Sequence, residues 1–241
     1  MILLEWYIPL SLLAVLVLVL LWRRAYVEAP CFSAYAAYGL CAGLTRFFVR
    51  SDQHAYYAVY WITEAGYDLL GMLVMYEVLR AVLKKLIRGW WANIIFVFIV
   101  LLGVGLSVAR AHDVPSKLTG LLFLIVLGET AVRFVEVLVF AGLVTLVPVV
   151  GLRWRQYSFG VATGFGLYAT VMLVTSAKFS DFGTTFKFLW GRTSLVAYSV
   201  AVLIWIWFFS VPQKIEDPKP NVPIPSPGVL RQYLDVLRRM R

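Results

Sequence analysis

Histidine and cysteine are scarce in this chain, which has two of each among its 241 residues. The cysteines, Cys31 and Cys41, lie ten residues apart in one apolar stretch. Ten residues of helix rise about 15 Å, whereas a disulfide needs Cα atoms within about 7 Å, so they cannot bridge each other. The histidines, His54 and His112, fall at the outer ends of two apolar stretches. They either share a metal or face water, and we expect the second. A membrane b-type haem is excluded, and no metal or other cofactor is expected.

Charge is also scarce. Only 15% of the residues are charged and 61% are hydrophobic, whereas soluble domains have about 25% charged and about 45–50% apolar residues. A water-soluble fold is therefore excluded. The net charge of +9 comes from Lys and Arg scattered through short loops rather than gathered on one face, so no nucleic-acid partner is expected. The abundant Trp, Tyr and Phe suit a protein that meets two membrane interfaces.

Motifs of known enzymes are absent. The chain has no nucleophile elbow, no HExxH and no P-loop. A retinal protein needs a lysine in its last helix, and residues 193–211 contain none. Glu129 and Arg133 have the ExxxR spacing of CAAX-processing intramembrane proteases, but those enzymes also need deep histidines. An enzyme is therefore the least supported class, and no catalytic residue is assigned.

Long apolar stretches dominate the chain. A transmembrane helix needs about 20 mostly apolar residues, and seven stretches qualify. The sequence therefore predicts an all-α, polytopic bundle of seven transmembrane helices over residues 1–212. The stretches are Trp6 to Trp22, Pro30 to Phe48, Tyr56 to Leu79, Trp91 to Val108, Leu118 to Pro148, Tyr157 to Ala177 and Thr193 to Val211.

The basic residues predict the orientation. Alternate loops carry fourteen Lys and Arg on one side and seven on the other, and the cytoplasmic side holds the excess. The C-terminus is then cytoplasmic and the N-terminus outside. Met1 to Trp6 has no positive charge, so the first stretch is counted as a retained span and not as a signal peptide.

The C-terminal tail has two predicted parts. Residues 213–228 contain five prolines and predict an extended linker in the cytoplasm. Ser226 is a candidate N-cap with Pro227 at the first helical position, and residues 229–241 predict a basic amphipathic helix. Its role is either to lie on anionic lipid or to dock a partner protein. Its two faces contain Leu230, Tyr233, Leu234 and Leu237 against Arg231, Arg238 and Arg239.

Ionisable residues occur deep in two of the predicted spans. Glu64 and Asp68 lie four residues apart in the third span, and Glu77 lies near Arg80 further along it. In the fifth span, Glu129, Arg133 and Glu136 are spaced by four and three residues, so they share one helix face. Each such residue costs about 2.5–3.5 kcal/mol on insertion scales. We expect both clusters to face the bundle interior and to meet if these two helices touch.

The deep acids outnumber the deep bases. Glu64, Asp68, Glu129 and Glu136 share one deep cation, Arg133, so at least two acids are left over. Such acids are either protonated or reached by water, a cation or tyrosine hydroxyls. Three interpretations stay open: a structural hydrogen-bonded contact between helices around Arg133, a proton or cation site, and a ligand-sensing pocket.

Small residues recur at close spacing in three other spans. Gly39 with Gly43 and Gly160 with Gly164 form GxxxG pairs, and Gly103 with Gly105 forms a third close pair. Such residues let helix backbones approach each other, so we expect them to mark packing contacts.

The third span also carries a family resemblance. Tyr60-Trp61, Glu64-Ala65 and Tyr76-Glu77-Val78 resemble a pattern in uncharacterised bacterial seven-span integral membrane proteins, with Gly160 to Gly166 as a second match. The resemblance implies a bacterial inner membrane location. It implies no activity, catalytic residue or ligand.

Three functions remain. The first is a non-enzymatic sensor or a docking subunit of a larger membrane assembly, with a protein partner or a second copy of the chain. The second is a proton- or cation-coupled transporter that uses the charged clusters. The third is a binding protein for lipid or an apolar ligand, with polar contacts from Tyr35, Tyr38, Tyr67 and Tyr168.

Overall fold

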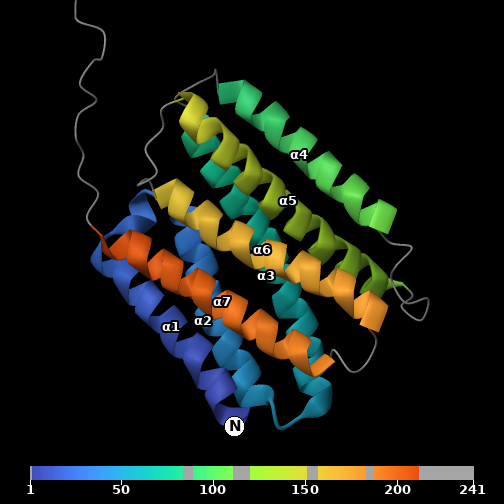
Figure 1. Ribbon diagram of the computed structural model, residues 1–241. Coiled ribbons are helices and arrows are strands. Elements are labelled where there is room, and N and C mark those ends of the chain that lie inside the picture. Colours follow the sequence, from blue (N-terminus) through green and yellow to red (C-terminus); the bar gives the residue numbers. More distant parts are fainter. Residues whose placement is uncertain (1, 84–88, 111–119, 151–156, 183–186, 212–241) are drawn as a thin grey trace, which may run out of the picture. The chain divides into compact units, whose positions relative to one another are not determined.

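The computed structural model describes residues 2–83, 89–110, 120–150, 157–182 and 187–211. Within these ranges the chain is all-α, with seven α-helices and one short 3₁₀ helix (Figure 1). Each predicted apolar stretch forms one helix, and the predicted ends are correct to within a few residues. The elements are α1 (Ile2–Trp22), η1 (Ala25–Val27), α2 (Pro30–Val49), α3 (Gln53–Leu83), α4 (Gly89–Arg110), α5 (Leu121–Val150), α6 (Tyr157–Phe182) and α7 (Lys187–Ser210).

In the described part of the chain, three helices are long and apolar enough to cross a membrane. Their apolar parts are Trp90–Arg110 of α4, Tyr157–Thr175 of α6 and Arg192–Ser210 of α7. The apolar part of α1, Tyr7–Trp22, is shorter. The helices α3 and α5 carry the deep acidic and basic residues, which interrupt their apolar runs. The chain therefore has the helices of a multi-pass membrane protein.

The predicted tail lies outside the described residues. This applies to the linker at 213–228 and to the amphipathic helix at 229–241, including Leu230, Arg231, Tyr233, Leu234, Leu237, Arg238 and Arg239. It also applies to His112.

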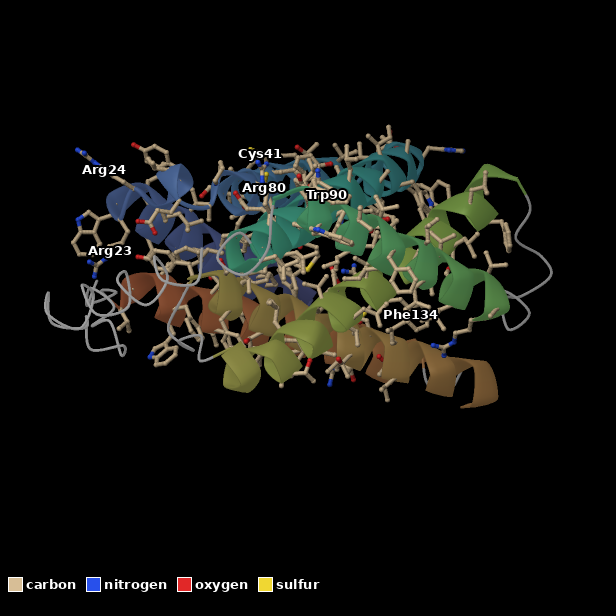
Figure 2. All side chains as sticks on the ribbon, turned by 90° about the horizontal axis from the view of Figure 1, so that it is seen from above. Arg23, Arg24, Cys41, Arg80, Trp90 and Phe134 are labelled. Atoms are coloured by element: carbon tan, nitrogen blue, oxygen red, sulfur yellow. The ribbon has the colours of Figure 1, made fainter. Side chains whose placement is uncertain are left out.

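Helix α3 packs against α2, α4, α5 and α6. The helix pairs α1/α2, α1/α7, α6/α7, α5/α6 and α4/α5 also pack together, and α4 lies at the edge beside α5 (Figure 1). The C-terminal ends of α1 and α7 meet, because Nη2 of Arg23 donates to the carbonyl oxygen of Ser210 at 2.6 Å. Arg23 and Arg24 project beyond the helix end (Figure 2). The two helices therefore end on the same side.

Polar and apolar side chains are distributed as in a membrane protein. Leu18, Phe98 and Leu101 are each 65% exposed, whereas Glu136 is 1% exposed and Arg133 9%. Large apolar side chains on the outside suit lipid, while charged groups need protein partners inside.

Glycines mark the closest helix contacts, as predicted for the paired small residues. A Cβ at Gly164 would lie 2.2 Å from Nε1 of Trp205, and one at Gly43 would lie 2.6 Å from Cδ2 of Leu10. Gly160 meets Phe208 and Gly103 meets Val135 in the same way. The prediction is wrong for Gly105, which has no neighbour within 4 Å in the described part of the chain.

An aromatic cluster fills the core at one end of α2, α6 and α7. The ring of Phe32 stacks on Phe209 with centroids 5.2 Å apart, and its edge meets Trp205 at the same distance. Phe165 lies 4.8 Å from Trp205. These side chains, with Tyr35, are at most 4% exposed. The cluster therefore forms a buried aromatic core at this end of the three helices.

Candidate functional site

Arg133 joins two carboxylates on α5. Its Nη1 donates to Oε2 of Glu136 at 3.1 Å, and its Nη2 lies 3.8 Å from Oε1 of Glu129. The spacing of four and three residues places these side chains on one helix face, as predicted. Glu136 lies midway along α5, and its side chain is buried. Arg133 is thus held at the middle of the helix between two acids.

Helices α3 and α5 pack against each other, which was the condition for their acidic clusters to meet. The two backbones approach at Gly71, where an added Cβ would lie 3.5 Å from Oε1 of Glu136. Asp68, the central residue of α3, lies within electrostatic range of Arg133, Glu129 and Glu136. We call Arg46, Glu64, Asp68, Glu129, Arg133 and Glu136 the polar centre.

Arg46 is the member that the sequence analysis missed. Glu64 was expected to share Arg133, but it pairs with Arg46 of α2 at 3.0 Å. Arg46 also donates from Nε to Oγ1 of Thr63 at 2.7 Å and from Nη2 to the carbonyl oxygen of Tyr60 at 3.3 Å. Because Arg46 lies in the last turn of α2, it was counted as a loop charge. Its long side chain instead turns inward to a carboxylate on the neighbouring helix.

Asp68 is the least satisfied acid of the polar centre. Its Oδ1 is buried and accepts no hydrogen bond from the part of the chain that the structure describes. The polar centre contains four acids and two arginines, and Arg133 is shared by two of the acids. Two negative charges therefore lack a basic partner if all four acids are ionised. A proton or another cation has to balance them in a membrane interior.

Glu77 and Arg80 do not belong to the polar centre. Glu77 was expected near Arg80, but its carboxylate accepts from the backbone N–H groups of Cys31 and Phe32 at 3.2 and 3.0 Å. It thus caps the N-terminus of α2, where the first N–H groups have no helical partner. The guanidinium of Arg80 lies 6.0 Å from the ring of Tyr76. Glu77 and Arg80 were expected only to lie near each other on this helix, and their contacts are with different neighbours.

A polar cavity of about 170 Å³ lies at the polar centre. Water occupies about 30 Å³ per molecule in the liquid, so the cavity has room for about five. Three of the four tyrosines expected at a ligand line it, whereas Tyr38 donates to the carbonyl oxygen of Thr63. Tyr198 of α7 also lines the cavity, although its position in the sequence did not predict this. The lining residues are Tyr35, Arg46, Glu64, Tyr67, Arg133, Glu136, Tyr168 and Tyr198.

The tyrosine rings of this region already face cations. The guanidinium of Arg133 lies 4.8 Å from the ring centre of Tyr168, and that of Arg46 lies 4.7 Å from the ring centre of Tyr60. Positive charge over an aromatic face is favourable, and more so away from water. The site can therefore stabilise positive charge through both carboxylates and rings.

Chelation of a metal ion does not fit the arrangement. Among the described residues, no three His, Cys, Asp or Glu side chains come together as ligands. His54 is exposed at the start of α3, where its backbone N–H donates to Asp52.

No family model, curated protein or solved structure matches the chain. The function is therefore argued from the polar centre and its surroundings.

Proposed function

We propose that this chain is a seven-span protein of the bacterial inner membrane that couples solute transport to a proton or cation bound at the polar centre. The observation that carries the proposal is Asp68. One of its oxygens is buried without a hydrogen-bond partner among the residues that the structure describes, in a group of four acids and two arginines. A binding site for positive charge in the middle of a membrane is the expected feature of proton relays and coupled transporters.

The helix arrangement supports the proposed topology. The ends of α1 and α7 meet through Arg23 and Ser210, which fits an even number of crossings, by α2 to α7, between these two ends. The excess of Lys and Arg places these ends in the cytoplasm. Asp68 and Glu136 lie midway along their helices, so the polar centre then lies near the middle of the bilayer.

The aromatic cluster would act as the closed side of the transporter. With the proposed topology, Phe32 near the start of α2 and Phe209 near the end of α7 lie toward the cytoplasm. Their rings stack with centroids 5.2 Å apart and are fully buried, so they would block water on that side. Transport would then require these rings to separate, as in alternating access. An open channel is the less suitable interpretation.

Proton flux tests the proposal. Liposomes containing the purified chain and a pH-sensitive dye are given an inside-negative potential by outward diffusion of potassium. We expect proton uptake above that of empty liposomes, with a fall of at least tenfold in Asp68→Asn and Glu136→Gln. Glu28→Gln is the matched control, because Glu28 is exposed and lies outside the polar centre. No uptake, or uptake unchanged in Asp68→Asn, would remove coupled transport.

A second candidate is a sensor or a docking subunit of a membrane assembly, with a protein partner or a second copy of the chain. The observation in its favour is α4, which packs mainly against α3 and α5 and leaves Phe98 and Leu101 exposed. That face would lie against lipid or another subunit. Purification in mild detergent tests this candidate. A monomer without partners, unchanged by deletion of residues 229–241, would contradict it.

A further inference from the structure

Two buried tyrosine hydroxyls at the polar cavity lack a protein partner. Tyr35 of α2 and Tyr168 of α6 both line the cavity, and neither hydroxyl forms a hydrogen bond within the part of the chain that the structure describes. Tyr35 is only 4% exposed. By contrast, Tyr67 on the same cavity donates to the carbonyl oxygen of Gly39 at 3.2 Å. Because buried polar groups are normally paired, the partner of the two free hydroxyls belongs in the cavity.

The charged groups of the cavity wall form two balanced pairs. Arg46 lies 3.0 Å from Glu64, and Arg133 lies 3.1 Å from Glu136. No other charged side chain among the described residues lines the cavity. An ionic group of either sign would lose its hydration and meet charges that are already paired. A neutral group with a hydroxyl or carbonyl oxygen loses less on leaving water and can pair with the free hydroxyls.

A larger, mainly apolar groove adjoins the polar cavity. Its volume is about 560 Å³, within the range of about 300–1,000 Å³ that is typical of small-molecule sites. Leu10 and Leu13 of α1 and Leu195 of α7 form part of its wall. Tyr67 and Tyr198 line both spaces, so the groove and the cavity are direct neighbours. One molecule could therefore place an apolar chain in the groove and a polar end in the cavity.

We propose that the groove and the polar cavity together bind one neutral amphipathic molecule, an alcohol or carbonyl compound with a single apolar chain. Its oxygen would replace water as the partner of the Tyr35 and Tyr168 hydroxyls. Its chain would lie along the leucines of the groove, where each buried methylene contributes to binding. This inference rests on the proposed function, since it names the class of solute that the protein would carry. The coupling charge belongs to Asp68 and Glu129, which do not line the cavity.

Photolabelling of the wild-type chain in lipid nanodiscs is the first test. The probe is an octanol that carries a photoreactive diazirine beside its hydroxyl, and the labelled residues are mapped by mass spectrometry. We expect label on residues that line the cavity, and 1-octanol should suppress it at a concentration at least tenfold lower than octyltrimethylammonium or octanesulfonate does. Equal suppression by either charged compound would overturn the neutral head. Label confined to the outer surface, or absent, would overturn the site.

The hydroxyl of Tyr35 is tested with Tyr35→Phe, which keeps the ring and removes the hydrogen bond. A typical hydrogen bond corresponds to a change of about three- to tenfold in affinity, so we expect suppression by 1-octanol to need that much more of it. Tyr57→Phe is the matched control, because Tyr57 is 52% exposed and lines neither space. Equal behaviour of the two variants would contradict the placement of the polar end.

Two substitutions on α7 test the placement of the chain. Leu195→Trp narrows the groove, whereas Leu203→Trp adds the same side chain at a position that is 51% exposed and does not line the groove. We expect Leu195→Trp to weaken suppression by 1-octanol at least tenfold and Leu203→Trp to leave it unchanged. Equal effects of the two variants would show that the chain lies elsewhere.

Failure of this inference is distinct from failure of coupled transport. Proton flux in liposomes without labelling of the cavity would reject the ligand class alone. Labelling of the cavity that 1-octanol suppresses, without proton flux, would reject transport and retain the binding site.

Discussion

Glu77 of α3 caps the first turn of α2 through Phe32, whose backbone N–H donates to Oε2 at 3.0 Å. The neighbouring N–H of Cys31 donates to the other carboxylate oxygen at 3.2 Å. Pro30 begins this helix and has no N–H of its own. One carboxylate therefore satisfies the first two free donors of α2 and fixes that helix end against α3.

The cap predicts a loss of stability in Glu77→Gln. The glutamine amide retains one acceptor oxygen but places an NH₂ group against the other donor. Hydrogen bonds to charged groups contribute about 1.5–3 kcal/mol each, so we expect the free energy of unfolding to fall by about 1–3 kcal/mol. Thermal unfolding in detergent, followed by tryptophan fluorescence, measures the change. Equal midpoints for Glu77→Gln and the exposed control Glu28→Gln would show that the cap contributes nothing.

The approach of α6 to α7 predicts opposite outcomes for two glycines. A methyl group at Gly164 would lie within 3 Å of the buried ring of Trp205, while nothing in the described part of the chain lies within 4 Å of the corresponding position at Gly142. Gly164→Ala should destabilise by about 1–3 kcal/mol through overpacking. Gly142→Ala should stabilise by up to about 1 kcal/mol through helix propensity. Unfolding midpoints that move in the same direction for both variants would refute this contact.

The pair of Arg46 and Glu64 predicts strong coupling between two substitutions. Their side chains are 13% and 16% exposed, so Arg46→Gln leaves a largely buried acid without its base. Removing one partner of a buried pair costs about 3–5 kcal/mol. The double variant with Glu64→Gln should therefore be more stable than Arg46→Gln alone. A double-mutant cycle measures the coupling, and additive effects would mean that the pair is not formed.

The charge distribution predicts the location of the C-terminus. A green fluorescent protein fused after Arg241 should fluoresce in the cytoplasm, and a periplasmic alkaline phosphatase fused at the same point should be inactive. A phosphatase fused after Arg110 should be active, since that helix end is predicted to lie outside. The opposite pattern would reverse the proposed orientation.

The helices could be predicted from sequence because each one is a long apolar run. Their ends are marked by Pro30 and by charged or aromatic residues such as Trp22. The common face of Glu129, Arg133 and Glu136 follows from helical spacing within one element. These predictions need only local periodicity, and the structure confirms them.

The partners of the polar centre could not be predicted in the same way, because they depend on which helices touch. Arg46 lies near the end of its apolar stretch, so the sequence predicts that it belongs to a loop. Its long side chain instead forms an ion pair with Glu64 on α3. Tyr198 has no polar neighbour in sequence and lines the cavity only because α7 packs beside α1 and α6. Glu77 was placed only near Arg80 in the sequence, while its hydrogen-bond partners, Phe32 and Cys31, lie 45 and 46 residues away.

The surplus of acids at the polar centre is the claim on which the proposed function rests, and infrared spectroscopy measures it directly. The carbonyl stretch of a protonated carboxylic acid is recorded at neutral pH, with N-methylglucamine as the only added cation. The account predicts a protonated band in the wild type that is reduced in Asp68→Asn and unchanged in Glu28→Gln. A spectrum without that band, or a band equally strong in Asp68→Asn, would contradict it.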